Sequence, residues 1–193
     1  MVSFYMDICI SLIEGIVITM NTLSYKVAFA IKQANPEGTS SIEVMQYSLS
    51  ILFNTACIII SSLVIGWLTG QWKGTILTLF SIALLRFVSG GVHLKSAKAC
   101  NIASILTCTI IPHLSSFLDN YILLINGVSL VIMAISAPKP DKNAQLPIKW
   151  FPFMKVIAML LVLSNFFIGS SVIGLAFFVQ SLTVIYWKRR VLL

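Results

Sequence analysis

The chain has 193 residues, of which 58% are hydrophobic and 10% charged, with a mean hydropathy of +0.97. A soluble domain carries about 25% charged residues, so the composition excludes one and indicates an integral membrane protein. The formal net charge is +7. Its basic residues lie in short connectors between apolar runs, which is typical of loops facing anionic lipid and not of nucleic-acid binding.

Residues 3–34 predict one long amphipathic helix. Its polar residues recur at intervals of four, three and seven, which places them on one face: Asp7, Ser11, Glu14 and Asn21. Such a helix either lies in the membrane interface, which we favour, or spans with its polar stripe turned inward. Met1 is not followed by the basic region, short apolar core and cleavage site that make up a signal peptide. We therefore expect no cleaved signal peptide.

A break over residues 35–41 separates this helix from a series of apolar runs. Ser40 or Ser41 is expected to cap the next helix, with Glu43 forming a capping box with Ser40. The apolar runs cover residues 42–69, 75–88, 101–118, 121–137, 153–168 and 171–187. We therefore expect an all-α integral membrane protein, a bundle of about six transmembrane helices with an amphipathic N-terminal one. Residues 1–193 are expected to form a single membrane-embedded domain.

The basic residues divide the connectors into two sets. One set holds only Lys73 and Asp119, whereas the other holds most of the lysines and arginines: Lys26, Lys32, Arg86, Lys95, Lys98, Lys139, Lys142, Lys149, Lys155 and Lys188 to Arg190. The positive-inside rule makes the second set cytoplasmic. Residues 86–100 are therefore predicted to face the cytoplasm, next to the connector of residues 138–152.

Residues 86–100 carry the most chemically competent side chains of the chain, His93 and Cys100. A nucleophilic cysteine needs a base within hydrogen-bond reach. On one continuous helix, seven residues rise about 10.5 Å, so the two side chains could not meet. A Cys–His dyad therefore requires a break, for which Gly90 and Gly91 are suited, and a return over residues 94–99.

The return would place Cys100 near the start of a helix that begins at about Asn101. Free backbone amides and the helix dipole at that point favour a thiolate and could form an oxyanion hole. Arg86 is positioned to pair with a carboxylate of the protein or of a substrate. The group that orients His93 stays open among Glu14, Glu43 and a backbone carbonyl.

Other interpretations of the same residues compete with the dyad. Cys9, Cys57 and Cys108 lie in apolar runs, where cysteine acts as a small hydrophobe. His113 is expected to be a bundle or helix-kink residue, and a zinc site built from it with His93 and Cys100 lacks a fourth ligand. We expect no metal and no cofactor. A small transporter and a nonenzymatic partner of a signalling receptor are the alternative functions.

Arg86, the run Gly90-Gly91-Val92-His93 and Cys100 resemble the signature of the AgrB family, the accessory gene regulator B peptide-processing endopeptidases. The length near 200 residues, the polar-striped N-terminal helix and the loop that holds Pro138-Lys139-Pro140 and Lys142 are also similar to that family. The resemblance covers nearly the whole chain.

The resemblance implies a membrane-integrated cysteine endopeptidase of bacterial quorum sensing, multi-pass in the cell membrane, with its site on the cytoplasmic side. It implies removal of the C-terminal tail of an AgrD-like precursor peptide at the lipid bilayer, and it allows a homodimer. Cys100 would be the nucleophile and His93 the general base and acid. The acyl-enzyme thioester would pass to an internal thiol of the peptide, closing a thiolactone. Substrate binding or structural support would fall to Arg86, Gly90, Gly91, Lys139 and Lys142.

Overall fold

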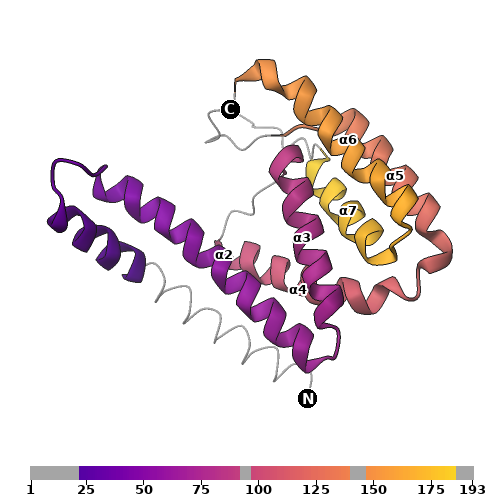
Figure 1. Cartoon of the computed structure of the whole chain (residues 1–193), viewed down its shortest axis with the longest axis horizontal. Coiled ribbons are helices and arrows are strands. Elements are labelled where there is room, and N and C mark those ends of the chain that lie inside the picture. Colours follow the sequence, from indigo (N-terminus) through magenta and orange to yellow (C-terminus); the bar gives the residue numbers. More distant parts are fainter. Residues whose placement is uncertain (1–21, 92–96, 140–146, 186–193) are drawn as a thin grey trace, which may run out of the picture. The chain divides into compact units, whose positions relative to one another are not determined.

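The computed structural model describes residues 22–91, 97–139 and 147–185, and their regular elements are all helices (Figure 1). Residues 22–34 form the first helix. It is followed by α2 (Ile42–Leu68), α3 (Trp72–Ser89), α4 (Ala97–Ser115), α5 (Ile122–Ser136), α6 (Phe151–Ile168) and α7 (Ser171–Val184). Short 3-10 turns, η1 (Asp119–Tyr121) and η2 (Ile148–Trp150), precede α5 and α6. The prediction of an all-α membrane protein is confirmed.

The helices differ in how far they could extend across a bilayer. Four stretches are long and apolar enough to span: Ile42–Leu68, Trp72–Ser89, Asp119–Ser136 and Phe151–Ile168. Two shorter apolar stretches are Ala99–Ser115 and Ser171–Val184. The 14 residues of α7 rise about 21 Å, which is less than the hydrocarbon thickness of about 30 Å. The protein therefore combines long spanning helices with shorter apolar ones.

The N-terminal prediction is tested only in its second half. Residues 22–34 are helical, as expected, whereas Asp7, Ser11, Glu14 and Asn21 lie outside the described residues. Ser41 is the serine that caps α2, because its Oγ accepts a hydrogen bond from the Val44 N–H at 3.4 Å. Glu43 is exposed in the first turn of that helix.

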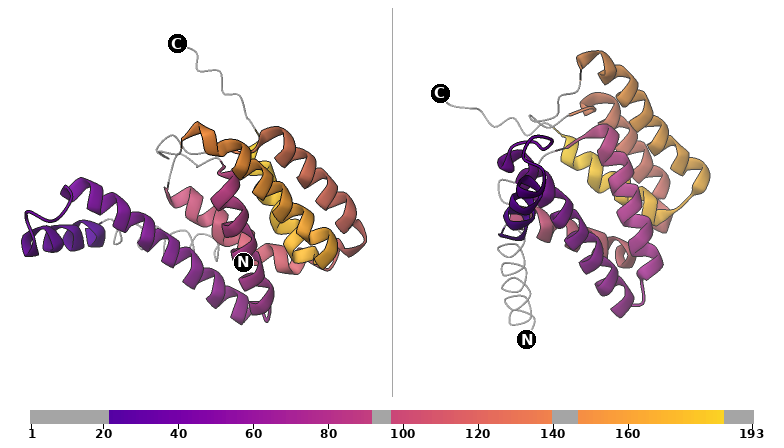
Figure 2. Two further views of the ribbon diagram at one scale, coloured as in Figure 1. Left: turned by 45° about the horizontal axis from the view of Figure 1, so that its top comes forward. Right: turned by 60° about the vertical axis from the view of Figure 1, so that its left-hand side comes forward.

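The described residues fall into two compact units. Unit 1 contains residues 22–62 and 97–106, and unit 2 contains residues 63–91, 107–139 and 147–185. Helices α3, α5, α6 and α7 lie wholly in unit 2. Within it, α7 packs against α5 and α3, and α6 packs against the same two helices (Figure 2).

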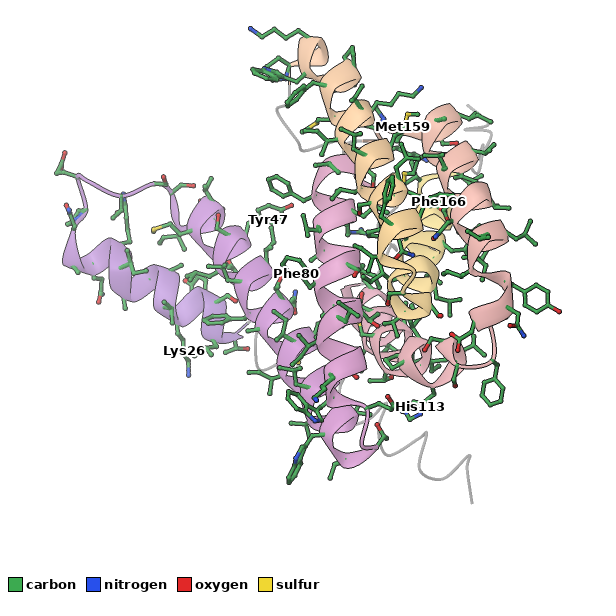
Figure 3. The ribbon with its side chains drawn as sticks, turned by 45° about the vertical axis from the view of Figure 1, so that its right-hand side comes forward. Lys26, Tyr47, Phe80, His113, Met159 and Phe166 are labelled. Atoms are coloured by element: carbon green, nitrogen blue, oxygen red, sulfur yellow. The ribbon has the colours of Figure 1, made fainter. Side chains whose placement is uncertain are left out.

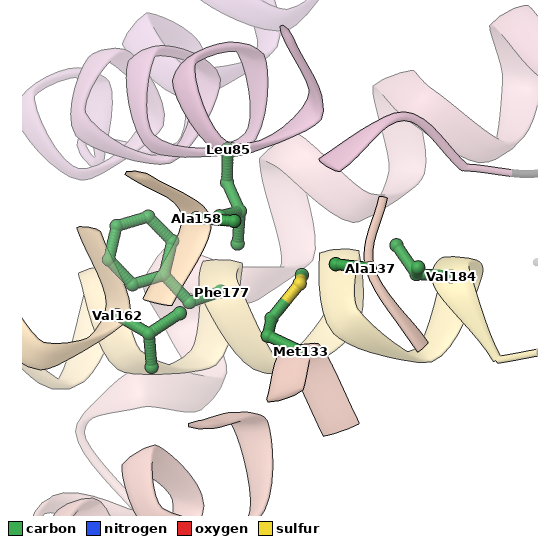
Figure 4. Packing of buried hydrophobic residues seen from close by; sticks show 7 residues of the cluster. All are labelled: Leu85, Met133, Ala137, Ala158, Val162, Phe177 and Val184. Carbon is green, nitrogen blue, oxygen red and sulfur yellow. The ribbon is translucent and has the colours of Figure 1, made fainter. Parts of the chain in front are cut away.

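Unit 2 has an apolar core made where these four helices meet. The side chains that form it are almost completely buried (Figure 4): Leu85, Met133, Ala137, Ala158, Val162, Phe177 and Val184. A second buried cluster joins Ile111 of α4 to Leu175 and Ala176 of α7. At the start of α3, an added Cβ on Gly74 would meet the Pro112 ring at 2.7 Å, so only glycine fits beside this proline. The last turns of α4 therefore pack against the first turn of α3.

Unit 2 consequently has two distinct ends. One end contains the last turn of α3, the end of α5 and the last turn of α7, since these are joined by hydrogen bonds described below. The other contains Gly74, Pro112 and the loop at Gly169, with His113 near it (Figure 3). Arg86 and Lys139 lie at the first end and Asp119 at the second.

Candidate functional site

Helix α3 ends directly before the glycine pair. A break at this point is what a dyad between His93 and Cys100 requires. Its last residue is Ser89, and the Gly90 N–H still bonds to the Arg86 carbonyl at 2.9 Å. Gly90 then adopts φ 68° and ψ −145°, and Gly91 adopts φ 144°. L-residues with a side chain rarely adopt these conformations, so the change of direction depends on glycine. Arg86 and Cys100 are therefore not on one straight helix.

The turn is anchored to the segment that follows α5. The Lys139 N–H donates to the Ser89 carbonyl at 2.8 Å, and the Gly91 N–H donates to the Lys139 carbonyl at 3.1 Å. These bonds make an isolated parallel bridge between Gly90 and Lys139. Residues fifty positions apart in the sequence are thus fixed side by side by their backbones.

A buried amide from α7 reaches the same turn. The Gln180 Nε2 donates to the Gly90 carbonyl at 2.8 Å and to the Ser89 Oγ at 3.3 Å. The Ser89 hydroxyl in turn donates to the Gly90 carbonyl at 3.2 Å. Gln180 is only 2% exposed and Ser89 is fully buried. The polar groups of this turn are therefore satisfied by one another inside the bundle, as buried polar groups must be.

Gly91 lies in a tight space between α3 and α7. An added Cβ would stand 2.6 Å from the Thr183 Oγ1, 3.3 Å from the Gln180 Nε2 and 3.4 Å from an Arg86 guanidinium nitrogen. The first of these distances is shorter than any ordinary contact. The guanidinium of Arg86 is thus placed directly against the backbone at Gly91.

Cys100 lies in the first turns of α4, as the fourth residue of that helix. The helix begins at Ala97, a few residues before the expected start at Asn101. Cys100 is a free cysteine with a partly exposed side chain, and its carbonyl accepts a hydrogen bond from the Ser104 Oγ at 2.8 Å. The first backbone N–H groups of a helix have no partner within it, and the proposal that they stabilise negative charge at Cys100 stays a prediction.

The residue after Cys100 fixes this helix start within unit 1. Asn101 is 4% exposed. Its Nδ2 donates to the Oδ1 of Asn54 on α2 at 3.3 Å. A side-chain amide pair between two apolar helices has few competing partners, so it favours a single register. The Asn54–Asn101 pair therefore holds the cysteine-bearing turn against α2.

The structure brings some of the predicted site residues together. Arg86, Gly90, Gly91 and Lys139 form one cluster at one end of unit 2, whereas Cys100 belongs to unit 1. His93 and Lys142 lie outside the described residues, so the dyad stays a prediction.

Sequence reasoning missed the partners of both predicted segments: Gln180, Thr183, Asn54 and Asn101. For Gln180 and Asn54, the available signal was an amide within an apolar run, because polar groups at membrane depth are candidates for a special role.

The alternative zinc site finds little support. His113 is exposed near the end of α4 (Figure 3). Thirteen residues of one helix separate it from Cys100, a rise of about 20 Å that no single ion could bridge. Across residues 22–91, 97–139 and 147–185, no group of three or more His, Cys, Asp and Glu side chains could hold a metal ion.

A family model described as "Accessory gene regulator B" matches residues 7–188. The chain belongs to the accessory gene regulator B family. The match includes Arg86, the glycine pair, His93 and Cys100, so the family resemblance stated from these residues is confirmed.

Named relatives agree with this membership. A putative AgrB-like protein of Halalkalibacterium halodurans is 27% identical over 110 residues, 57% of this chain and 55% of that protein. An accessory gene regulator protein B of Staphylococcus aureus is 34% identical over 95 residues, 46% of this chain and 51% of its own length. The chain thus spans about half the length of the curated relatives that it matches. No solved structure matches significantly.

Proposed function

We propose that this member of the accessory gene regulator B family is a membrane cysteine endopeptidase that processes a quorum-sensing precursor peptide. Cys100 is the nucleophile, and His93 is its general base and acid. The substrate is an AgrD-like peptide lying on the cytoplasmic face of the cell membrane. Removal of its C-terminal tail is coupled to closure of a thiolactone ring.

The observation that carries the proposal is the break in the chain between Arg86 and Cys100. A straight helix would have kept positions 93 and 100 about 10.5 Å apart and would have ruled out direct proton transfer. Instead, α3 ends at Ser89 and a new helix begins at Ala97. Arg86 and Cys100 therefore lie on two different helices, and the spacing of one straight helix does not rule out a dyad.

The first half of the reaction is acyl transfer to the enzyme. The Cys100 thiol passes its proton to His93, and the sulfur attacks the carbonyl carbon of the scissile peptide bond. Backbone N–H groups at the start of α4 are suited to stabilise the oxyanion. The C–N bond then breaks, His93 gives its proton to the leaving amine, and the shortened peptide remains on Cys100 as a thioester.

The second half exchanges one thioester for another. A cysteine thiol within the bound peptide attacks the acyl carbon, the bond to Cys100 breaks, and the displaced thiolate takes up the proton of the attacking thiol. Because the two thioesters have similar energies, ring closure competes with hydrolysis only where water is scarce. A site at the face of an apolar bundle limits access of water.

The charge distribution supports a cytoplasmic site. Arg86 and Lys139 share one end of unit 2, with Lys149 and Lys155 at the start of α6, whereas Asp119 is at the other end. The positive-inside rule assigns the basic end to the cytoplasm. The basic residues there also attract an acidic peptide segment by charge.

Processing by purified protein tests the proposal. The full chain is reconstituted in lipid vesicles with a synthetic precursor that has an internal cysteine, and the tail-less product is measured by mass. Cys100→Ala and His93→Ala are each expected to lower the rate at least about 1000-fold. Cys57→Ala is the matched control, because Cys57 is also a partly exposed free thiol in unit 1.

A precursor that lacks the internal cysteine separates the two steps. It is expected to leave a peptide adduct on Cys100 that hydroxylamine releases. Processing that survives both Cys100→Ala and His93→Ala would contradict the dyad. A protein that moves the uncleaved peptide across the vesicle membrane, and does so equally well with Cys100→Ala, would instead be a transporter.

A further inference from the structure

The turn at Gly90 and Gly91 has a partner that belongs to neither of the segments that the proposed mechanism uses. Gln180 lies on α7, 90 residues further along the chain, and its Nε2 bonds to the Gly90 carbonyl at 2.8 Å. The same nitrogen reaches the Ser89 Oγ at 3.3 Å. One amide therefore holds both the last residue of α3 and the first residue of the turn.

This contact is unusual for its surroundings. Gln180 follows Phe177, Phe178 and Val179 in an apolar helix and is 2% exposed. Burying an amide is costly unless it is hydrogen-bonded, so an apolar side chain would stabilise simple packing at this position at least as well. What the glutamine adds is a fixed position for the Gly90 carbonyl.

The position of that carbonyl determines how the chain leaves the turn. The carbonyl of Gly90 is in the same peptide plane as the N–H of Gly91, and this N–H is bonded to Lys139 at 3.1 Å. Both sides of one peptide plane are thus held, by α7 on one side and by the segment after α5 on the other. Thr183, one turn beyond Gln180, closes the space around the Gly91 Cα.

His93 follows Gly91 by two residues. We infer that Gln180 is a positioning residue for the general base: it holds the Gly90–Gly91 peptide plane, the last described point of the chain before His93. The inference rests on the proposed function, since it assigns His93 the role of base. In this assignment Gln180 acts through the backbone of the turn and not on the reacting atoms.

A positioning role predicts a specific kinetic pattern. Loss of the Gln180 amide leaves binding of the precursor intact but misplaces the base, and a misplacement of about 1 Å lowers a rate about 100-fold. Gln180→Met keeps the length of the side chain and removes the donor. We expect kcat for the reconstituted full chain to fall about 100-fold, with KM changed less than about twofold.

Ser181→Ala is the matched control. Ser181 is the next residue of α7, is fully buried, and its Oγ donates within the helix to the Phe178 carbonyl. Its loss perturbs the same helix without touching the turn, so we expect kcat and KM near those of the unaltered protein. Gln180→Leu replaces Gln180→Met if the latter does not accumulate in membranes.

A second measurement detects the position of residue 93 without any processing. In a chain with Cys9→Ala, Cys57→Ala, Cys108→Ala and His93→Cys, mild oxidation joins the introduced thiol to Cys100 at a rate set by how often the two meet. We expect Gln180→Met to slow this disulfide formation about tenfold, because the turn two residues before position 93 is then no longer held by α7, and Ser181→Ala to leave it unchanged.

The outcomes separate the two claims. If the unaltered protein does not process the precursor but Gln180→Met still slows the disulfide, the proposed function fails and the positioning of residue 93 stands. If Gln180→Met matches Ser181→Ala in both measurements, the inference is overturned. It is also overturned if KM rises while kcat is constant, or if kcat falls with no change in disulfide formation, because Gln180 then acts elsewhere.

Discussion

Two glycine turns in unit 2 are each held by a buried amide, but the amides come from different distances along the chain. At Gly169, the amide belongs to Asn165 of the preceding helix: its Nδ2 donates to the Ser170 carbonyl at 3.0 Å, and its Oδ1 accepts from the Ser170 N–H at 3.2 Å. At Gly90, the amide belongs to Gln180, 90 residues away. The amide that closes the first turn comes from a neighbouring residue, whereas the amide that closes the second comes from a remote helix and acts beside the backbone bonds to Lys139.

The two turns therefore differ in what their geometry depends on: the Gly169 turn depends on nearby residues, and the Gly90 turn depends on a distant helix. The Gly169 turn joins α6 to α7 and can form as soon as those residues are made. The Gly90 turn depends on α7 and on the segment after α5, because Gln180 and Lys139 supply bonds to it. Its geometry therefore rests on contacts between residues far apart in the sequence.

Among changes at the two glycine turns, the largest expected effect is that of Gly91→Ala on processing. The new Cβ would stand 2.6 Å from the Thr183 Oγ1, on a residue with φ 144°. The turn must therefore shift, and we expect the rate of precursor processing to fall at least about 100-fold. Gly127→Ala is the control, since an added Cβ on that helical residue meets nothing within 4 Å. Processing by Gly91→Ala at the rate of Gly127→Ala would remove the functional contrast between the two turns.

The next effect is on stability and concerns the other turn. Asn165 is fully buried and also donates to the Asn126 Oδ1 at 3.0 Å, joining α6 to α5. Asn165→Leu removes these bonds, and we expect the free energy of unfolding to fall by about 1–2 kcal/mol. The kcat of the folded fraction should not change.

Thermal unfolding in detergent, with activity measured in parallel, tests this expectation for Asn165. Ser164→Ala is the control, because the Ser164 Oγ bonds only within its helix, to the Leu161 carbonyl at 2.7 Å. A fall in kcat as large as that of Gly91→Ala would mean that both turns serve the reaction.

The smallest effect is expected from Gly169→Ala. Gly169 adopts φ 66° and ψ 25° in open space, so an added Cβ meets no neighbour and only the backbone conformation is penalised. We expect a loss of about 1 kcal/mol in the free energy of unfolding and no loss of processing. Gly169→Asn should recover part of that loss, since asparagine tolerates this conformation better. Equal unfolding midpoints for Gly169→Ala and Gly169→Asn would contradict the backbone explanation.

The helix boundaries followed well from local signals in the sequence. The expected run of residues 42–69 is the helix Ile42–Leu68, and the expected gap between the runs 153–168 and 171–187 separates α6 from α7. Glycine and the ends of apolar runs act over a few residues, so these features are visible without a structure. The predicted start of α4 at about Asn101 is too late, because the predicted return over residues 94–99 includes residues that are helical. Alanine and lysine are good helix formers, and α4 already begins at Ala97.

The sequence predicted the break in the chain at the candidate site but not the residues that hold this break. Physical reach required a break at Gly90 and Gly91, and α3 does end there. The partners of the break could not be found in the same way, because nothing local connects Gly90 to Gln180 or Asn101 to Asn54. Pairings over such separations are decided by which helix faces meet. His93 lies outside the described residues, so its approach to Cys100 stays a prediction.

The bridge between Gly90 and Lys139 is made by main-chain atoms alone. Any residue except proline can supply the N–H and carbonyl at position 139, so this joint tolerates sequence drift on the connector side. A connector segment taken from another family member and grafted after position 139 would therefore meet the same main-chain joint to the end of α3.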